Sequence, residues 1–112
     1  MSVIYEVNLA VDADIAPEFA HWLPRHIDEM LALPGFTGAD AAQELVDQSD
    51  LVKWCIRYRL SDQDALKAYI QSHAEQMRAD GIQRFGKKFK AHRRILTPMA
   101  IADCAHKKCG PD

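Results

Sequence analysis

Cysteines are few and long apolar runs are absent, and each shortage excludes a class of protein. Only Cys55, Cys104 and Cys109 occur among the 112 residues. The first eleven residues alternate like a strand and have no basic segment, so we do not expect them to be a signal peptide. Together with the odd number of cysteines, this argues against a disulfide framework. No apolar run approaches the roughly 20 residues that a membrane-spanning helix needs. We therefore expect a cytoplasmic protein with reduced thiols and no membrane association.

The chain also lacks a large excess of charge of either sign. Lysine and arginine number 14 against 16 aspartates and glutamates, for a formal net charge of −2. A chain so nearly balanced has no long-range attraction for nucleic acid or anionic lipid. Apolar residues make up 48% of the chain, which is ordinary for a folded protein. At this length we expect one domain, residues 1–98, and a C-terminal tail, residues 99–112.

Alternation of apolar and polar residues predicts the strands. In the first stretch every second residue is apolar, so one face of the strand is apolar and the other carries Glu6 and Asn8. The second and third stretches are separated by a polar turn at 47–50, which is typical of a hairpin. The four strands are expected at residues 3–11, 36–46, 51–60 and 88–96.

A helical period fills the two gaps between strands. Residues 15–33 carry one apolar stripe, with a bend expected at Pro24 and an end at the Pro-Gly pair that follows. A capping sequence at 61–64 opens the second helix, which Gly81 should interrupt and Gly86 should close. The order strand-helix-strand-strand-helix-strand predicts a ferredoxin-like α+β fold, in which two helices cover one face of a four-stranded antiparallel sheet.

Both predicted helices carry the same pattern. A large apolar pair, a histidine three residues on and a methionine four beyond it recur at an offset of 47 residues, as Trp22-Leu23-x-x-His26-x-x-x-Met30 and Tyr69-Ile70-x-x-His73-x-x-x-Met77. Each histidine projects near the middle of its apolar stripe. We therefore expect His26 and His73 to face the sheet and to lie close together.

These residues define a candidate pocket between the helices and the sheet. Histidine titrates near neutral pH, so the two imidazoles would serve as acid/base groups or as ligands of a cofactor that the sequence does not name. The competing interpretation is that the histidines are neutral packing residues and the remaining side chains ordinary core. The candidate lining residues are Tyr5, Trp22, His26, Tyr58, His73 and Met77.

The opposite face of the sheet is polar and carries two arginines, Arg57 and Arg59. One interpretation is a solvated face, and another is a dimer in which two sheets face each other across a polar interior. Within such a dimer the arginines would pair with Glu6 or bind an anion, because guanidinium groups suit carboxylate and phosphate. Ion pairing is favoured, since Glu6 is an available counter-charge.

Two further sequence patterns are too weak to predict a binding site. Basic residues interleaved with phenylalanines at 84–94 suggest RNA, but the third strand lacks the aromatic pattern of RNA-recognition motifs, so nucleic-acid binding is not expected. Cys104, His106 and Cys109 offer three soft ligands where structural zinc takes four, so no metal site is predicted.

Several short stretches together resemble an uncharacterised bacterial family, the domain of unknown function 4286. They are Tyr5-Glu6-Val7-Asn8-Leu9, Trp22-Leu23-x-x-His26, Met30-Leu31-x-Leu33-Pro34-Gly35-Phe36, Tyr58-Arg59-Leu60, His73-x-x-x-Met77-Arg78, Arg84-Phe85 and Arg93-Arg94-Ile95-Leu96. The resemblance runs from about Val3 to Pro98. It implies a dimeric α/β-barrel similar to antibiotic-biosynthesis-type monooxygenases, with no established activity and no assigned catalytic residues.

Taken together, the residues and the resemblance favour a homodimeric barrel that binds a small molecule, with monooxygenase-like chemistry if it is an enzyme. The first alternative is a non-catalytic structural or regulatory dimer whose histidines are structural. A less favoured alternative is an RNA-binding module that uses the basic last strand. The sequence decides neither whether the protein is an enzyme nor which ligand it takes.

Overall fold

The computed structural model describes residues 2–45 and 50–99. Within them, the elements follow the order β1-α1-β2-β3-α2-α3-β4, with one short 3-10 turn after β1 and another before β4. The strands are β1 (Val3–Asp12), β2 (Phe36–Gln43), β3 (Leu51–Leu60) and β4 (Phe89–Leu96). The helices are α1 (Ala16–Leu31), α2 (Gln63–Ser72) and α3 (Ala74–Phe85). Apart from Met99, the expected tail lies outside the described residues, as does most of the turn expected at 47–50.

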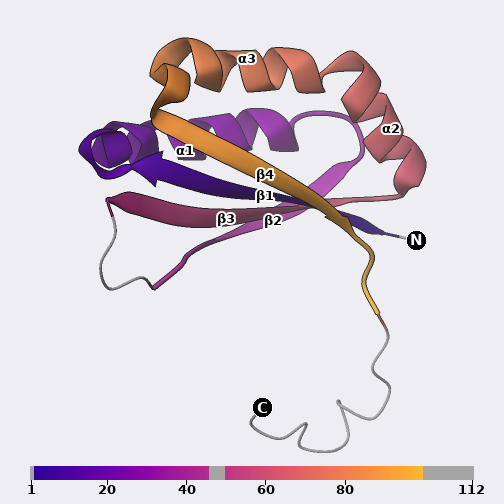
Figure 1. Cartoon of the computed structure of the whole chain (residues 1–112). Coiled ribbons are helices and arrows are strands. Elements are labelled where there is room, and N and C mark those ends of the chain that lie inside the picture. The colour runs from indigo at the N-terminus through magenta and orange to yellow at the C-terminus, as the bar shows by residue number, and fades with distance from the viewer. Residues whose placement is uncertain (1, 46–49, 100–112) are drawn as a thin grey trace, which may run out of the picture.

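The four strands form one antiparallel sheet in the order β2-β3-β1-β4. All three helices lie on one face of this sheet and leave the other face uncovered, as Figure 1 shows. The predicted ferredoxin-like architecture is therefore confirmed. None of the helices in the described part of the chain combines the length and apolar character that a membrane span requires.

Alternation along the central strands places the core between the sheet and the helices. On β1, Val3, Tyr5, Leu9 and Val11 are buried, and on β3 the buried residues are Ile56, Tyr58 and Leu60. The helices contribute a second set of buried side chains, which comprises Phe19, Trp22, Met30, Leu66, Tyr69 and Ala74. Burying each large apolar side chain contributes about 1.5–3 kcal/mol, so this two-layer contact is the main source of stability.

The second helical segment differs from the prediction in where it breaks. His73, with φ −132° and ψ −28°, leaves the helical conformation and separates α2 from α3. Gly81, where the interruption was expected, lies inside α3 and is buried. A Cβ atom there would lie 3.3 Å from Cη2 of Trp22 and 3.4 Å from Cζ of Phe89. The absent side chain of Gly81 therefore allows α3 to pack close to these rings.

Other helix ends follow the sequence signals. Asp62 caps α2, because its Oδ1 accepts a hydrogen bond from the Ala65 backbone N–H at 2.8 Å. Gly86 closes α3 with a positive φ of 58°, as predicted. Gly35, with φ 86°, turns the chain from α1 into β2. Helix α1 continues through Pro24.

Candidate functional site

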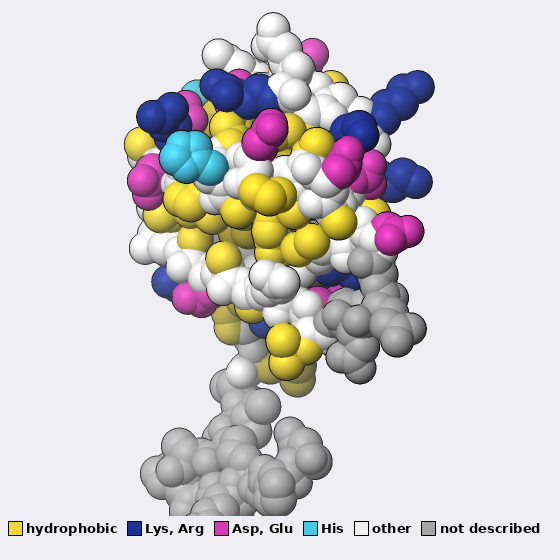
Figure 2. All heavy atoms as spheres, turned by 90° about the vertical axis from the view of Figure 1, so that its left-hand side faces the viewer, with side chains coloured by type: hydrophobic (Ala, Val, Ile, Leu, Met, Phe, Trp, Pro, Cys, Tyr) yellow, Lys and Arg dark blue, Asp and Glu magenta, His cyan; other side chains and the backbone are white. Residues whose placement is uncertain are grey.

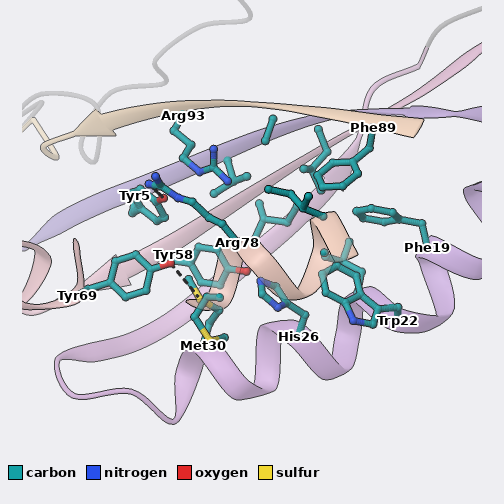
Figure 3. Close-up of a pocket in the computed structure, with 18 of the residues that line it drawn as sticks. Tyr5, Phe19, Trp22, His26, Met30, Tyr58, Tyr69, Arg78, Phe89 and Arg93 are labelled. Atoms are coloured by element: carbon teal, nitrogen blue, oxygen red, sulfur yellow. Dashed lines mark hydrogen bonds between the residues drawn. The ribbon is translucent and has the colours of Figure 1, made fainter. Parts of the chain in front are cut away.

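A cavity of about 240 Å³ lies between the helix layer and the sheet. Five of the six predicted pocket residues, Tyr5, Trp22, His26, Tyr58 and Met77, line it (Figure 3). They come from β1, α1, β3 and α3, so the cavity draws on both layers of the fold. Most of its other lining residues are apolar or aromatic, among them Val7, Leu9, Phe19, Met30, Ile56, Tyr69, Ile82 and Phe89.

His73, the sixth predicted residue, is not part of this lining. It is half-buried at the junction of α2 and α3, where its backbone N–H donates to the Tyr69 carbonyl at 2.8 Å. The projection that placed it beside His26 assumed an unbroken helix, and the chain changes direction at His73 itself. Among the described residues, the lining of the cavity therefore includes one histidine, His26, and the expected pairing of His26 with His73 is not found there.

His26 is the titratable side chain with the most distinctive environment in the cavity. Its ring stacks on Trp22 with centroids 4.6 Å apart and an interplanar angle of 23°. Its Nδ1 atom is buried and has no hydrogen-bond partner among the described residues. Burial lowers the pKa of His26, against the opposing charges of Glu29 and Asp80. The imidazole is therefore neutral at pH 7 and has a nitrogen free to exchange a proton.

Ring contacts hold the cavity walls in place. Phe19 contacts Trp22 and Phe89, each at a centroid distance of 5.2 Å, and Tyr5 contacts Tyr69 edge-on at 5.5 Å. Tyr69 also donates from its hydroxyl to the sulfur of Met30 at 3.5 Å. Edge-on and tilted aromatic pairs contribute about 0.5–1.5 kcal/mol beyond their buried area, which makes this wall a rigid one.

One end of the cavity is cationic. Arg78 from α3 donates through Nη2 to the hydroxyl of Tyr5 at 3.0 Å, whereas its Nε atom is buried without a partner among the described residues. Arg93 from β4 lines the same cavity, and Figure 3 shows its guanidinium on the Tyr5 side, away from Phe19 and Trp22. Sequence reasoning did not select either arginine for the pocket.

The uncovered face of the sheet is organised around Glu6. The register places Glu6 directly opposite Arg57 on β3 and Arg94 on β4. Its carboxylate accepts from Nε of Arg94 at 2.6 Å, from Nε of Arg57 at 2.7 Å and from the Asn8 amide at 2.8 Å. The hydrogen bonds from Arg94, Asn8 and Arg57 lower the pKa of Glu6 to about 2, although burial opposes them.

The two arginines predicted as possible anion ligands both pair with carboxylates of the chain itself. Arg57 pairs with Glu6, and Arg59 donates through Nη1 to Asp40 at 2.8 Å. Glu6 is only 1% exposed, because these neighbouring side chains lie over it on the sheet. The ion pairing that the sequence favours is therefore present, and an anion at Arg57 or Arg59 would compete with Glu6 or Asp40 for the positive charge; the anion site stays a prediction.

One group of possible metal ligands includes His26 of the cavity lining. His26, Glu29 and Asp80 each place one possible ligand atom within 4.8 Å of the others. Sequence reasoning missed this cluster, because Asp80 comes from another helix and is also paired with Arg84 at 3.4 Å. The cluster expected not to bind metal, at 104–109, lies outside the described residues.

Three of the six basic residues at 84–94 form ion pairs within the chain. Arg84 pairs with Asp80, Lys88 pairs with Asp14 at 2.8 Å, and Arg94 is held by Glu6. Figure 2 shows the end of the molecule where α1 begins, with hydrophobic side chains in a band between charged ones. In this view, the described basic side chains alternate with acidic ones and with the hydrophobic band.

A family model described as Domain of unknown function (DUF4286) matches residues 2–99. The chain belongs to this family. A search of the curated proteins finds no match for this DUF4286 chain.

Solved structures share the fold of this DUF4286 chain at low sequence identity. A variant of SnoaB, a cofactor-independent oxygenase from Streptomyces nogalater, is similar with a TM-score of 0.66 at 15% identity, over 89% of this chain and 96% of that one. A putative monooxygenase from Shewanella loihica has a TM-score of 0.55 at 17% identity, over 89% and 98%. A dabb family protein with a ferredoxin-like fold from Mesorhizobium loti has a TM-score of 0.60 at 14% identity, over 89% and 100%.

Proposed function

We propose that this DUF4286 protein binds a small, largely apolar molecule in the cavity and that His26 transfers a proton to or from it. The observation that carries the proposal is the unpartnered Nδ1 of a neutral His26 in an aromatic cavity. Small-ligand sites are commonly concave and apolar, with a few polar groups that fix the ligand. A general base needs a free nitrogen within reach of its substrate, and a lowered pKa keeps that nitrogen unprotonated.

Monooxygenase-like chemistry is the more specific form of this proposal. Its support is the shared fold with a protein titled an oxygenase and with another titled a putative monooxygenase. A shared fold at such low sequence identity does not assign catalytic residues to this chain. Oxygen consumption must therefore be measured directly. The competing function is a non-catalytic dimer in which His26 only packs against Trp22.

Binding is best followed through the fluorescence of Trp22. Trp54 lies outside the cavity, so a Trp54→Phe background leaves Trp22 as the reporter. A panel of small, largely apolar compounds of one or two rings is titrated into this protein, and oxygen uptake is recorded with each compound that binds. We expect at least one saturable change in Trp22 fluorescence.

Two histidine variants give a matched comparison. His26→Ala should weaken binding or abolish turnover, whereas His21→Ala, on the exposed side of the same helix, should change neither. If no compound binds and His26→Ala is merely less stable, His26 has a packing role and the proposal fails.

We also propose that the protein is a homodimer that buries the uncovered face of its sheet. In support, none of the described helices covers this face of the sheet, where Ile4 and Ala10 add half-buried apolar surface beside the Glu6 ion pairs. Light scattering should give twice the mass of the chain. Cys55→Trp, which adds bulk to this face, should yield monomers, whereas Ala68→Trp on the exposed surface of α2 should not. A wild-type monomer at micromolar concentration would contradict the proposal.

A further inference from the structure

The cavity contains two arginines and no acid. Arg78 and Arg93 both line it, and neither aspartate nor glutamate occurs among the described lining residues. Both guanidinium groups lie close enough to Tyr69 to affect it. Burial raises the pKa of Tyr69, and the positive charges of Arg78 and Arg93 both lower it. Figure 3 shows the two guanidinium groups near Tyr5, at the end of the cavity opposite Trp22 and Phe19.

Four of the five other arginines of this chain, Arg57, Arg59, Arg84 and Arg94, each pair with a carboxylate, and the fifth, Arg25, is exposed on α1. Within residues 2–45 and 50–99, Arg93 makes no ion pair, and Arg78 makes one side-chain hydrogen bond, to the hydroxyl of Tyr5. Two like charges at the edge of an apolar cavity repel each other and lose hydration, so they are unfavourable without a counter-charge.

The Nε atom of Arg78 indicates where a negatively charged group would bind. Nε of Arg78 is buried and unpartnered in the described part of the chain, although the Nη2 of the same group is satisfied. A buried charged donor without an acceptor is costly, and native structures rarely leave one. With Arg93 beside it, the site offers free donors to two acceptor oxygens.

We propose that Arg78 and Arg93 form a carboxylate subsite, and that the ligand of the cavity is a ring-bearing carboxylate. This inference rests on the proposed function, since it names the chemical class of the molecule bound there. The carboxylate oxygens accept from Nε of Arg78 and from the guanidinium of Arg93. The ring of the ligand lies against Trp22, Phe19 and Phe89, with His26 beside it.

The dimensions of the cavity agree with such a ligand. About 240 Å³ lies somewhat below the roughly 300–1,000 Å³ of pockets for drug-sized molecules, so a compound of one or two rings is the expected size. Guanidinium groups bind carboxylates through charge-assisted hydrogen bonds, which are about twice as strong as neutral ones. A cationic ligand is disfavoured by the same two arginines.

The test compares two ligands of the same shape, naphthalene-2-carboxylate and naphthalene-2-carboxamide. Each is titrated at pH 7 into the full chain carrying Trp54→Phe. We expect the carboxylate to bind at least about tenfold more tightly, the equivalent of one charge-assisted hydrogen bond. Arg93→Met should bring the two dissociation constants together without weakening the carboxamide. Arg25→Met, an exposed arginine on α1 outside the cavity, should leave the preference unchanged.

Each other outcome has a defined meaning. Equal affinity of the two ligands in the unsubstituted cavity overturns the carboxylate subsite and leaves the proposed small-molecule site standing. Binding of neither ligand contradicts both. Because Arg78 also holds Tyr5, Arg78→Met can lower stability, so Arg78→Lys and the thermal unfolding of each variant are measured alongside. A preference that survives both Arg93→Met and Arg78→Met would also overturn the assignment.

Discussion

Replacing Glu6 by glutamine tests the electrostatics of the sheet face. The pKa of Glu6 is lowered from 4.5 to about 2, which corresponds to at most about 3 kcal/mol of stabilisation at neutral pH. The side chains of Arg57 and Arg94 are 52% and 53% exposed, so solvent screens part of this interaction. We therefore expect Glu6→Gln to lower the free energy of unfolding by about 1–3 kcal/mol at pH 7.

The same substitution has a defined effect on the pH dependence. A carboxyl group with a lowered pKa in the folded state contributes fully above its unfolded value, and the contribution is lost as pH falls. The wild-type protein should therefore lose this stability between pH 4.5 and about 2, and Glu6→Gln should lack that loss. Urea denaturation measured from pH 7 to pH 2, at fixed protein concentration, gives both quantities.

Asp40→Asn provides the matched control for Glu6. Asp40 also pairs with an arginine, but its side chain is 77% exposed, and exposed pairs contribute at most about 1 kcal/mol. If Glu6→Gln and Asp40→Asn lose equal stability and both keep the wild-type pH profile, then the ion pairs of Glu6 with Arg57 and Arg94 do not supply the expected stabilisation.

Three further substitutions follow from local geometry and are measured by thermal or urea denaturation. Gly35→Ala should destabilise by about 1–3 kcal/mol, because φ is 86° and a Cβ atom would clash with Ala65. Gly86→Ala should cost less, since φ is 58° and nothing lies near the new Cβ; equal losses would contradict the role of crowding. His26→Ala should remove a pH dependence of stability: the lowered pKa of His26 makes the wild type lose stability as pH falls below 6.5, and the variant should not show this loss. An unchanged profile in His26→Ala would mean that another group is responsible.

The fold could be predicted because each element carries its own periodic signal. Alternation on β1 and β3 and the apolar stripe of α1 arise from burial of one face, which the sequence records directly. The break at His73 carries no Gly or Pro, so nothing local marks it. Gly81 carries such a signal and was interpreted as a break, but its role is the close approach of α3 to Trp22 and Phe89.

The candidate site could be predicted only in part, because local periodicity marks its apolar residues but not its arginines. Tyr5, Trp22, His26, Tyr58 and Met77 lie on the apolar faces of their elements, and those faces meet in one core. The cationic end depends on long-range pairing. Arg78 and Arg93 are brought together by the packing of α3 over β4, and the Arg94 contact to Glu6 depends on the β1–β4 register, which alternation alone does not specify.

The two tryptophans allow the small-molecule site to be examined in one NMR titration. Trp22 lines the cavity, whereas the indole N–H of Trp54 donates to Gln43 at 3.1 Å outside it. We predict that naphthalene-2-carboxylate shifts the indole N–H resonance of Trp22 saturably and leaves that of Trp54 in place. Equal movement of both resonances, or none in either, would contradict a ligand site between the helices and the sheet.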